Sequence, residues 1–257
     1  MKPEEVAAYV GAAAWLPQII HWGYNYFVRP KLTISIGRQV EIGFTNLGPI
    51  FNVPLAFSVA NKDLILDKIE VSICHQGGEC HDLTWHGLGE TFSEITDNHG
   101  NKQTVGKNQS APIAIKVSTI GLFEKSVRFQ DPIYHKENRQ LMDELKDHAR
   151  YLYRKDSASA ASELFSSKQY IQLHEKRLKH FYWKAGRYSV RIKASSQSEF
   201  VQITPNFEFD LSDSDINLLS VNCQLIGVSI QNDLGKGNPE YRPEPTKWRW
   251  VYVNRIE

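Results

Sequence analysis

The sequence predicts a mainly β protein, a β-sandwich that carries a helical pair as an insertion and follows an apolar N-terminal helix. Residues 6–28 contain no Asp, Glu, Lys or Arg, and after Pro30 apolar and polar residues alternate as they do in half-buried strands. Residues 134–183 lose this alternation and are rich in Glu, Lys, Arg, Leu and Ala, which favours helices. We therefore expect an N-terminal helix at 1–30 and one β domain at 31–257.

The uncharged run Val6–Val28 is long enough to span the hydrocarbon core of a membrane, about 30 Å, as a helix. Its second half is rich in Trp, Tyr and Phe, which gather where a membrane helix meets water. Arg29 and Lys31 follow, so the positive-inside rule predicts a single N-terminal membrane helix with the C-terminal domain in the cytoplasm. Pro17 would kink this helix, which leaves open a helix lying in the membrane interface or one packed in a cytoplasmic protein.

The clearest local prediction is a hairpin. Residues 69–73 and 81–85 alternate, and Gln76-Gly77-Gly78 forms a turn between them. One register brings the large apolar residues onto one face of both strands, and that face fixes the register. It predicts four cross-strand pairs: Ile73–His81, Val71–Leu83, Ile69–Trp85 and Cys74–Cys80.

Further segments share the period of two, and together they predict five to seven short strands: Leu32–Ile36, Val40–Phe44, Val53–Val59, Ile113–Val117 and Val127–Phe129. This number of strands favours a β-sandwich. The stretch Ala185–Val190 resembles the start of a late strand in immunoglobulin-like domains. We therefore expect an immunoglobulin-like β-sandwich, completed by a strand within Trp248–Val253.

The expected helical insertion covers about residues 134–183. Leu141, Leu145 and Leu152 recur at the spacing of one helix face, and residues 156–162 form the joint to a second helix. Farther on, Ser212 and Asp215 resemble a capping box in front of an apolar run. Residues 97–110 are polar with two glycines and predict a loop.

Two segments carry a resemblance to other proteins. The anchor-like N-terminus followed by VEIGFTNLGPIFNVPLAFSVANKD and later IAIKVSTIGLFEKSVRFQDPIYH resembles a group of uncharacterised bacterial proteins. The resemblance covers about residues 30–135. It implies a bacterial source and brings no known activity and no site residues.

Cys74 and Cys80 lie opposite each other in the predicted hairpin. Opposite Cβ atoms in antiparallel strands are about 4.5–5.5 Å apart, near the separation that a disulfide needs. We expect two free thiols, with a disulfide and a metal site as alternatives. A metal site is the weaker alternative, because Cys74 and His75 point to opposite faces of a strand and no second pair has zinc-finger spacing. We expect no metal and no cofactor.

A basic stretch at residues 168–193 contains eight Lys and Arg residues and one acid, Glu175, with five aromatic residues among them. Such a stretch can bind nucleic acid through phosphates and stacked bases, or it can lie on anionic lipid headgroups. It can equally be a solvated face whose aromatic residues belong to the core. The candidate residues for binding an anionic partner are Lys176, Arg177, Lys179, Lys184 and Arg187.

The formal net charge of +1 favours no particular class of partner. The sequence has no phosphate-binding loop, dinucleotide fingerprint, nucleophile elbow or zinc-protease motif. We therefore expect a membrane-associated, non-enzymatic binding or scaffold module that engages a protein partner. Two alternatives stay open: a nucleic-acid or nucleotide-binding protein that uses the basic stretch, and a hydrolase whose catalytic residues are scattered along the chain.

Overall fold

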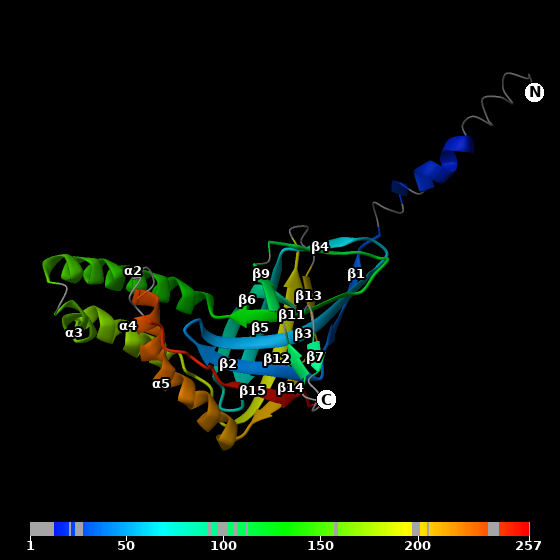
Figure 1. The fold of residues 1–257 in the computed structure, drawn as a ribbon. Helices are drawn as coiled ribbons and strands as arrows, with labels where there is room; N and C mark the ends of the chain where they lie inside the picture. The colour runs from blue at the N-terminus through cyan, green and yellow to red at the C-terminus, as the bar shows by residue number, and fades with distance from the viewer. Residues whose placement is uncertain are drawn as a thin grey trace, which may run out of the picture.

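The structure is a computed structural model, shown in Figure 1, and it is mainly β with a few helices. It describes residues 13–20, 22–23, 28–91, 94–96, 102–104, 107–111, 113–156, 159–196, 201–204, 206–235 and 242–256.

The strands of the described residues are β1 (Lys31–Ile36), β2 (Gln39–Thr45), β3 (Gly48–Ala60), β4 (Leu64–Leu66), β5 (Lys68–His75), β6 (Cys80–Thr91), β7 (Glu94–Thr96), β8 (Lys102–Thr104), β9 (Lys107–Ser110), β10 (Ile115–Val117), β11 (Phe123–Gln130), β12 (Gly186–Ser195), β13 (Val201–Ile203), β14 (Phe207–Leu211) and β15 (Trp250–Asn254). The helices with complete bounds are α2 (Pro132–Lys155), α3 (Ala160–Phe165), α4 (Lys168–Lys179) and α5 (Asp213–Gly235).

Eleven of the described strands form one antiparallel sheet, in which β12, β5, β6, β11, β3, β2 and β15 follow one another. β14 pairs with the first half of β12, and an isolated bridge joins it to the chain just after β15, where the Ile256 amide donates to the Glu208 carbonyl at 2.7 Å. The sheet therefore curls until its two ends meet. β4 and β10 form a separate two-stranded ribbon, which lies at the end of the sheet where the chain enters β1 (Figure 1).

The core lies inside this curled sheet, because alternate side chains of each strand point inward. Phe51 of β3 stacks on Phe209 of β14 with ring centroids 5.8 Å apart, although these strands are not neighbours. Tyr188 of β12 also stacks on Phe209, with ring centroids 5.1 Å apart. Contacts across the interior, and not only between neighbouring strands, therefore hold the curled sheet together.

The predicted hairpin is confirmed with its register, since Val71 pairs with Leu83 and Ile73 with His81. The apolar pattern of one buried face is sufficient to fix such a register. The prediction of a loop at residues 97–110 is wrong in part, because β9 lies there and pairs with β6, and β8 pairs with β7.

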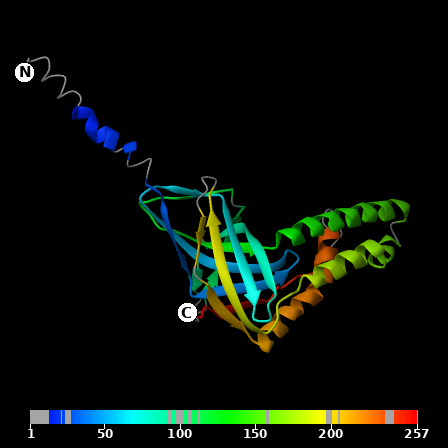
Figure 2. The ribbon, with the colours of Figure 1, turned by 180° about the vertical axis from the view of Figure 1, so that it is seen from behind.

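α2, α3 and α4 form a helical arm at one end of the sheet, and Figures 1 and 2 show that the arm extends away from it. The arm matches the predicted helical region closely, although it begins at Pro132 and holds three helices where a pair was expected, since α3 begins within the expected joint. α2 begins at Pro132 and is capped by the Asp131 carboxylate, which accepts hydrogen bonds from the amides of Ile133 and Tyr134. Its buried face contains Leu145 and Leu152, as the periodicity predicted.

α5 begins with the predicted capping box, which is confirmed. The Asp215 amide donates to the Ser212 hydroxyl at 3.2 Å, and the Ser212 amide donates to the Asp215 carboxylate at 2.9 Å. Farther along α5, the fully buried Asn222 side chain binds both the backbone N–H and the C=O of Arg249. This pair of bonds holds the last connector against α5 and delivers the chain to β15, the predicted closing strand.

Residues 13–20 and 22–23 are helical and lie outside the body of the protein, beyond the start of β1 (Figures 1 and 2). Their bulky apolar side chains face away from the sheet: Trp15, Leu16, Ile19, Ile20 and Trp22 are between 54% and 83% exposed. Most of the remaining predicted span lies outside the described residues. Among the described residues, no helix has both the length and the apolar character needed to cross a membrane.

Candidate functional site

The five candidate cations do not lie on one common surface. Lys176, Arg177 and Lys179 belong to α4, whereas Lys184 precedes β12 and Arg187 lies in it. Their acidic partners are on three different elements. Lys176 Nζ is 2.6 Å from Glu137 of α2, Lys184 Nζ is 2.7 Å from Glu79 beside β6, and Arg187 Nε is 3.0 Å from Asp210 of β14.

These ion pairs cancel much of the positive charge that the sequence suggests. Exposed pairs contribute little stability, but each one places a carboxylate where a phosphate would otherwise approach. The hydrogen bonds from Lys184 lower the pKa of Glu79, and those from Lys176 lower the pKa of Glu137. Lys179 is exposed, and the structure shows no acidic partner for it within the described chain.

Arg177 is a buried residue of the helical arm and not part of an exposed cationic face, because only 2% of it is exposed. It follows the buried Leu173 by four residues, so both lie on the side of α4 that packs inward. Its Nε donates to Asn138 Oδ1 of α2 at 2.7 Å, while Nη1 has no hydrogen-bond partner in the described structure. Burial lowers the pKa of Arg177, and nearby Tyr134 and Asp233 oppose this shift.

A polar cluster forms where α2 and α4 meet the sheet. His180 Nδ1 lies 3.3 Å from Asp131, the N-cap of α2, and His180 Nε2 lies 3.6 Å from Glu137. The Tyr134 ring contacts His180 edge-on, and its hydroxyl donates to the Asn46 carbonyl in the β2–β3 turn. Burial raises the pKa of Tyr134 to about 12. The cluster therefore joins the two helices to the sheet.

Two stacked ring pairs continue this junction. His81 lies flat on the partly buried Tyr182 with centroids 3.6 Å apart, and His86 stacks on His135 at 4.6 Å. His135 Nε2 is hydrogen-bonded to the Gln130 side chain. Burial lowers the pKa of all three histidines, so they are neutral near pH 7. In the part of the chain that the structure describes, no group of three His, Cys, Asp or Glu side chains is placed to hold a metal ion.

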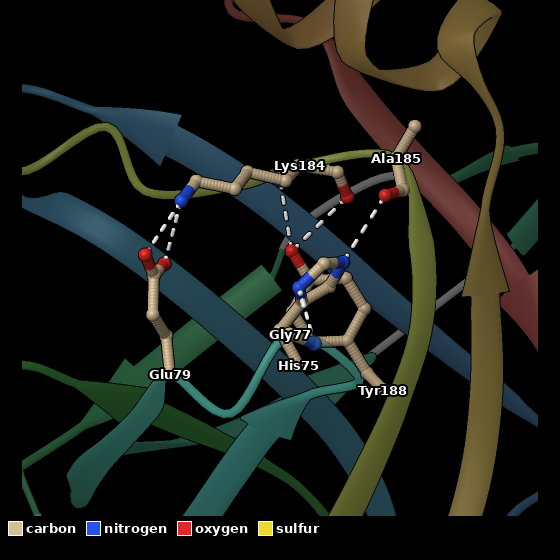
Figure 3. Close-up of polar contacts among 6 residues, drawn as sticks. All are labelled: His75, Gly77, Glu79, Lys184, Ala185 and Tyr188. Carbon is tan, nitrogen blue, oxygen red and sulfur yellow. Dashed lines mark hydrogen bonds and ion pairs between the residues drawn. The ribbon is translucent and has the colours of Figure 1, made fainter.

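Figure 3 shows a second polar cluster, at the turn between β5 and β6. His75 Nδ1 accepts from the Gly77 amide at 3.1 Å, and its Nε2 donates to the Ala185 carbonyl at 3.1 Å, which assigns a neutral ring. The Tyr188 hydroxyl accepts from the Lys184 amide and donates to the Lys184 carbonyl. These contacts fix the turn to the entry of β12.

A disulfide between Cys74 and Cys80 closes the same hairpin. The expectation of two free thiols is therefore wrong in this structure, and the disulfide alternative holds. The predicted register had placed the two residues opposite each other, and the pairing confirms that placement. The residue pattern could place the two cysteines opposite each other, but it could not show whether they are bonded.

The opposite end of the sheet has an apolar surface that the sequence did not predict. Ile113 was assigned to a strand with Ile115 and Val117, yet it precedes β10 and is 91% exposed. Ile120, in the turn after β10, is 96% exposed. The sequence signal that could have revealed this surface is Ile120, a large apolar residue inside the polar run Ser118–Gly121. Alternation alone could not show where the short strand ends.

A hollow of about 680 Å³ lies on the outer face of the sheet. It forms where small residues of neighbouring strands meet, Gly37 beside β1, Ala56 of β3 and Gly89 of β6. Glu124 and Lys125 of β11 supply its charged groups. The hollow is open and shallow enough to suit a surface contact.

No known protein family, curated protein or solved structure matches this chain. The resemblance of residues 30–135 to bacterial proteins therefore stays a prediction. Any functional argument must rest on the geometry of the described residues.

Proposed function

We propose that the protein is a membrane-associated, non-enzymatic binding module. The observation that carries this proposal is the exposed apolar helix at residues 13–20 and 22–23. Trp22 is 83% exposed, and the sheet and the helical arm leave the bulky side chains of this helix uncovered. Large apolar surfaces of this kind mark contact with a membrane or a partner. The uncharged character of residues 6–28 favours the membrane.

The same proposal includes an orientation. Arg29 and Lys31 stand between the apolar segment and the domain, and positive charges of this kind favour the cytoplasmic side of a membrane. The helical arm and the outer face of the sheet would then be presented to cytoplasmic proteins. The shallow hollow beside Glu124 and Lys125 is the surface that we assign to a protein partner.

We also propose that the sheet is related to immunoglobulin-like sandwiches. The hydrogen bond from the Tyr188 hydroxyl to the carbonyl of Lys184, four residues upstream, supports this relation. A tyrosine that binds back to the backbone near the start of a late strand is a feature of such domains. Residues 185–190 are the stretch whose sequence suggested the relation.

Membrane fractionation with alkaline carbonate extraction tests the proposed function. We expect the full-length chain to stay in the membrane pellet, and Leu16→Glu with Ile19→Glu to release it, because charges in an apolar phase are costly. Ile171→Glu, an exposed isoleucine of α4, is the matched control and should change nothing. Extraction of the unaltered chain into the soluble fraction would contradict the proposal.

A further inference from the structure

The end of the sheet nearest the N-terminal helix carries exposed aliphatic side chains on three separate segments. Ile65 of β4 and Leu122 before β11 are 58% and 60% exposed, and Ile113 and Ile120 are 91% and 96% exposed. We refer to these four residues as the apolar end. Single exposed aliphatic side chains are common, but several from different segments at one end form a surface that has a function.

The apolar end is an ordered part of the fold. β4 pairs with β10, and the ribbon buries Leu64, Leu66, Ile115 and Val117 against the core. The alternating positions, Ile65 and its partner Lys116, therefore face outward. Asp63, just before β4, fixes the turn after β10, because its carboxylate accepts a hydrogen bond from the Thr119 amide at 2.9 Å. Regular pairing thus holds Ile65 outward, and the Asp63 bond fixes the turn that carries Ile120.

This end is also where the N-terminal segment joins the sheet. The Asn61 side chain donates to the Arg29 carbonyl at 3.3 Å, and Lys31 pairs with Ala60 in the first strand pair. Both views place the N-terminal helix beyond the end marked by β4, while the helical arm lies at the other end (Figures 1 and 2). An apolar helix held in a membrane would therefore bring the apolar end close to the bilayer surface.

The charges around the apolar end suit an anionic surface. Lys31, Lys62 and Lys116 are exposed there, and Lys116 Nζ also lies 3.1 Å from Asp63. A lysine next to an anionic leaflet is attracted to its phosphates. A side chain that is 96% exposed, such as Ile120, protrudes from the surface and cannot form the wall of a groove. Protruding aliphatic groups suit a fluid apolar phase better than a preformed protein groove.

We propose that the apolar end rests on an anionic phospholipid bilayer, with Ile65, Ile113, Ile120 and Leu122 in the interfacial layer and Lys62 against the lipid phosphates. This inference rests on the proposed function and adds the orientation of the domain. The helical arm then points away from the bilayer, and the curled sheet stands between the membrane and the arm.

Hydrogen exchange of the full-length chain in vesicles tests the proposal. The vesicles are phosphatidylcholine alone, or phosphatidylcholine with phosphatidylglycerol. We expect the amides of residues 118–122 to exchange several-fold more slowly on the anionic vesicles than in detergent. Lys62→Gln should lower the ratio of docked to undocked domains about fivefold, the factor that corresponds to ~1 kcal/mol per lysine.

Ile120→Ser with Leu122→Ser should abolish this protection, while Ile171→Ser with Tyr151→Ser on the helical arm should preserve it. All four positions are exposed, so neither double variant should unfold the chain. Unprotected amides in a chain that still floats with the vesicles would overturn the docking and leave the proposed function standing. A chain that does not float would overturn both. Protection that rises with protein concentration in the absence of vesicles would assign the surface to a second copy and overturn the proposal.

Discussion

The two ends of the curled sheet differ in how far their large side chains are buried. At the arm end, Trp183, Tyr134 of α2 and Arg177 of α4 are all buried. At the other end, one face of the β4–β10 ribbon covers the core. Ile65 on the outer face of the ribbon and Ile120 in the turn after β10 are exposed. One end is covered by α2 and α4, whereas the other presents apolar side chains that the described part of the chain leaves exposed. Substitutions at the two ends should therefore act on different properties, folding at the first and association at the second.

The largest difference should come from removing a large side chain at each end. Trp183 is buried and its Nε1 donates to the Gly43 carbonyl at 3.1 Å. Trp183→Ala should lower the free energy of unfolding by about 3–5 kcal/mol, since it leaves a cavity and removes the hydrogen bond to the Gly43 carbonyl. Ile120→Ala should change it by less than ~0.5 kcal/mol. Urea denaturation measures both, and equal losses would remove the distinction between the two ends.

A smaller effect is expected where the β5–β6 turn contacts the start of β12. Gly186 has φ of 127°, and an added Cβ would lie 2.6 Å from Gln76 Nε2 and 2.8 Å from His75 Nε2. Gly186→Ala should therefore destabilise the fold by about 1–3 kcal/mol. Gly78 also has positive φ, at 92°, but an added Cβ there meets nothing within 4 Å. Gly78→Ala thus measures the cost of the backbone conformation alone. If Gly78→Ala lowers the free energy of unfolding as much as Gly186→Ala does, the clash of the added Cβ with Gln76 and His75 contributes nothing.

The arm end should also respond to pH through its stacked histidines. Burial lowers the folded-state pKa of His81, His86 and His135 below the usual value of 6.5. Between the folded and unfolded pKa values the unfolded chain binds more protons, so the free energy of unfolding should fall as the pH drops below about 6.5. Carboxylates with a lowered pKa act mainly below about pH 5 and contribute little in this range.

Urea midpoints measured between about pH 7.5 and about pH 5.5 test this dependence. Replacing the stacked pair through His86→Phe with His135→Phe should reduce the slope, because two of the three proton-binding groups are removed. An unchanged slope in that variant would assign the effect to other groups.

The smallest effect is expected from the exposed ion pairs. Lys176→Gln and Lys184→Gln should each change the free energy of unfolding by about 0.5 kcal/mol or less. Binding of a single-stranded oligonucleotide at low salt should be weak in the unaltered chain, because Glu137, Glu79 and Asp210 accompany the cations. Tight, salt-sensitive binding that these substitutions abolish would instead support the nucleic-acid alternative.

Features that depend on neighbouring residues in the chain could be predicted from the sequence. The register of Val71 with Leu83 and the capping box of Ser212 with Asp215 both follow from short-range patterns, and both are confirmed. The bridge between Glu208 and Ile256 joins residues far apart in the chain, and alternation shows the face of a strand but not its neighbours. The closure of the sheet was therefore beyond prediction.

The candidate sites show the same limit. The basic stretch was found by counting charges, but the count could not show that Arg177 faces inward or that Lys184 meets Glu79 from a distant hairpin. Likewise Ile113 fitted the alternation of a strand, and only the position of β10 shows that it lies outside the sheet. Long-range pairing decided both outcomes.

The Cys74–Cys80 disulfide offers a way to measure on which side of a membrane the domain lies. Cytoplasmic thiol systems keep such pairs reduced, whereas oxidising compartments preserve them. Quenching of intact cells in acid, followed by alkylation of the denatured protein at neutral pH and mass spectrometry, therefore reports the side of the membrane on which the domain lies. If Cys74, Cys80 and Cys223 are all labelled, the domain lies in the cytoplasm, as Arg29 and Lys31 predict. If only Cys223 is labelled, the domain lies on the opposite side of the membrane.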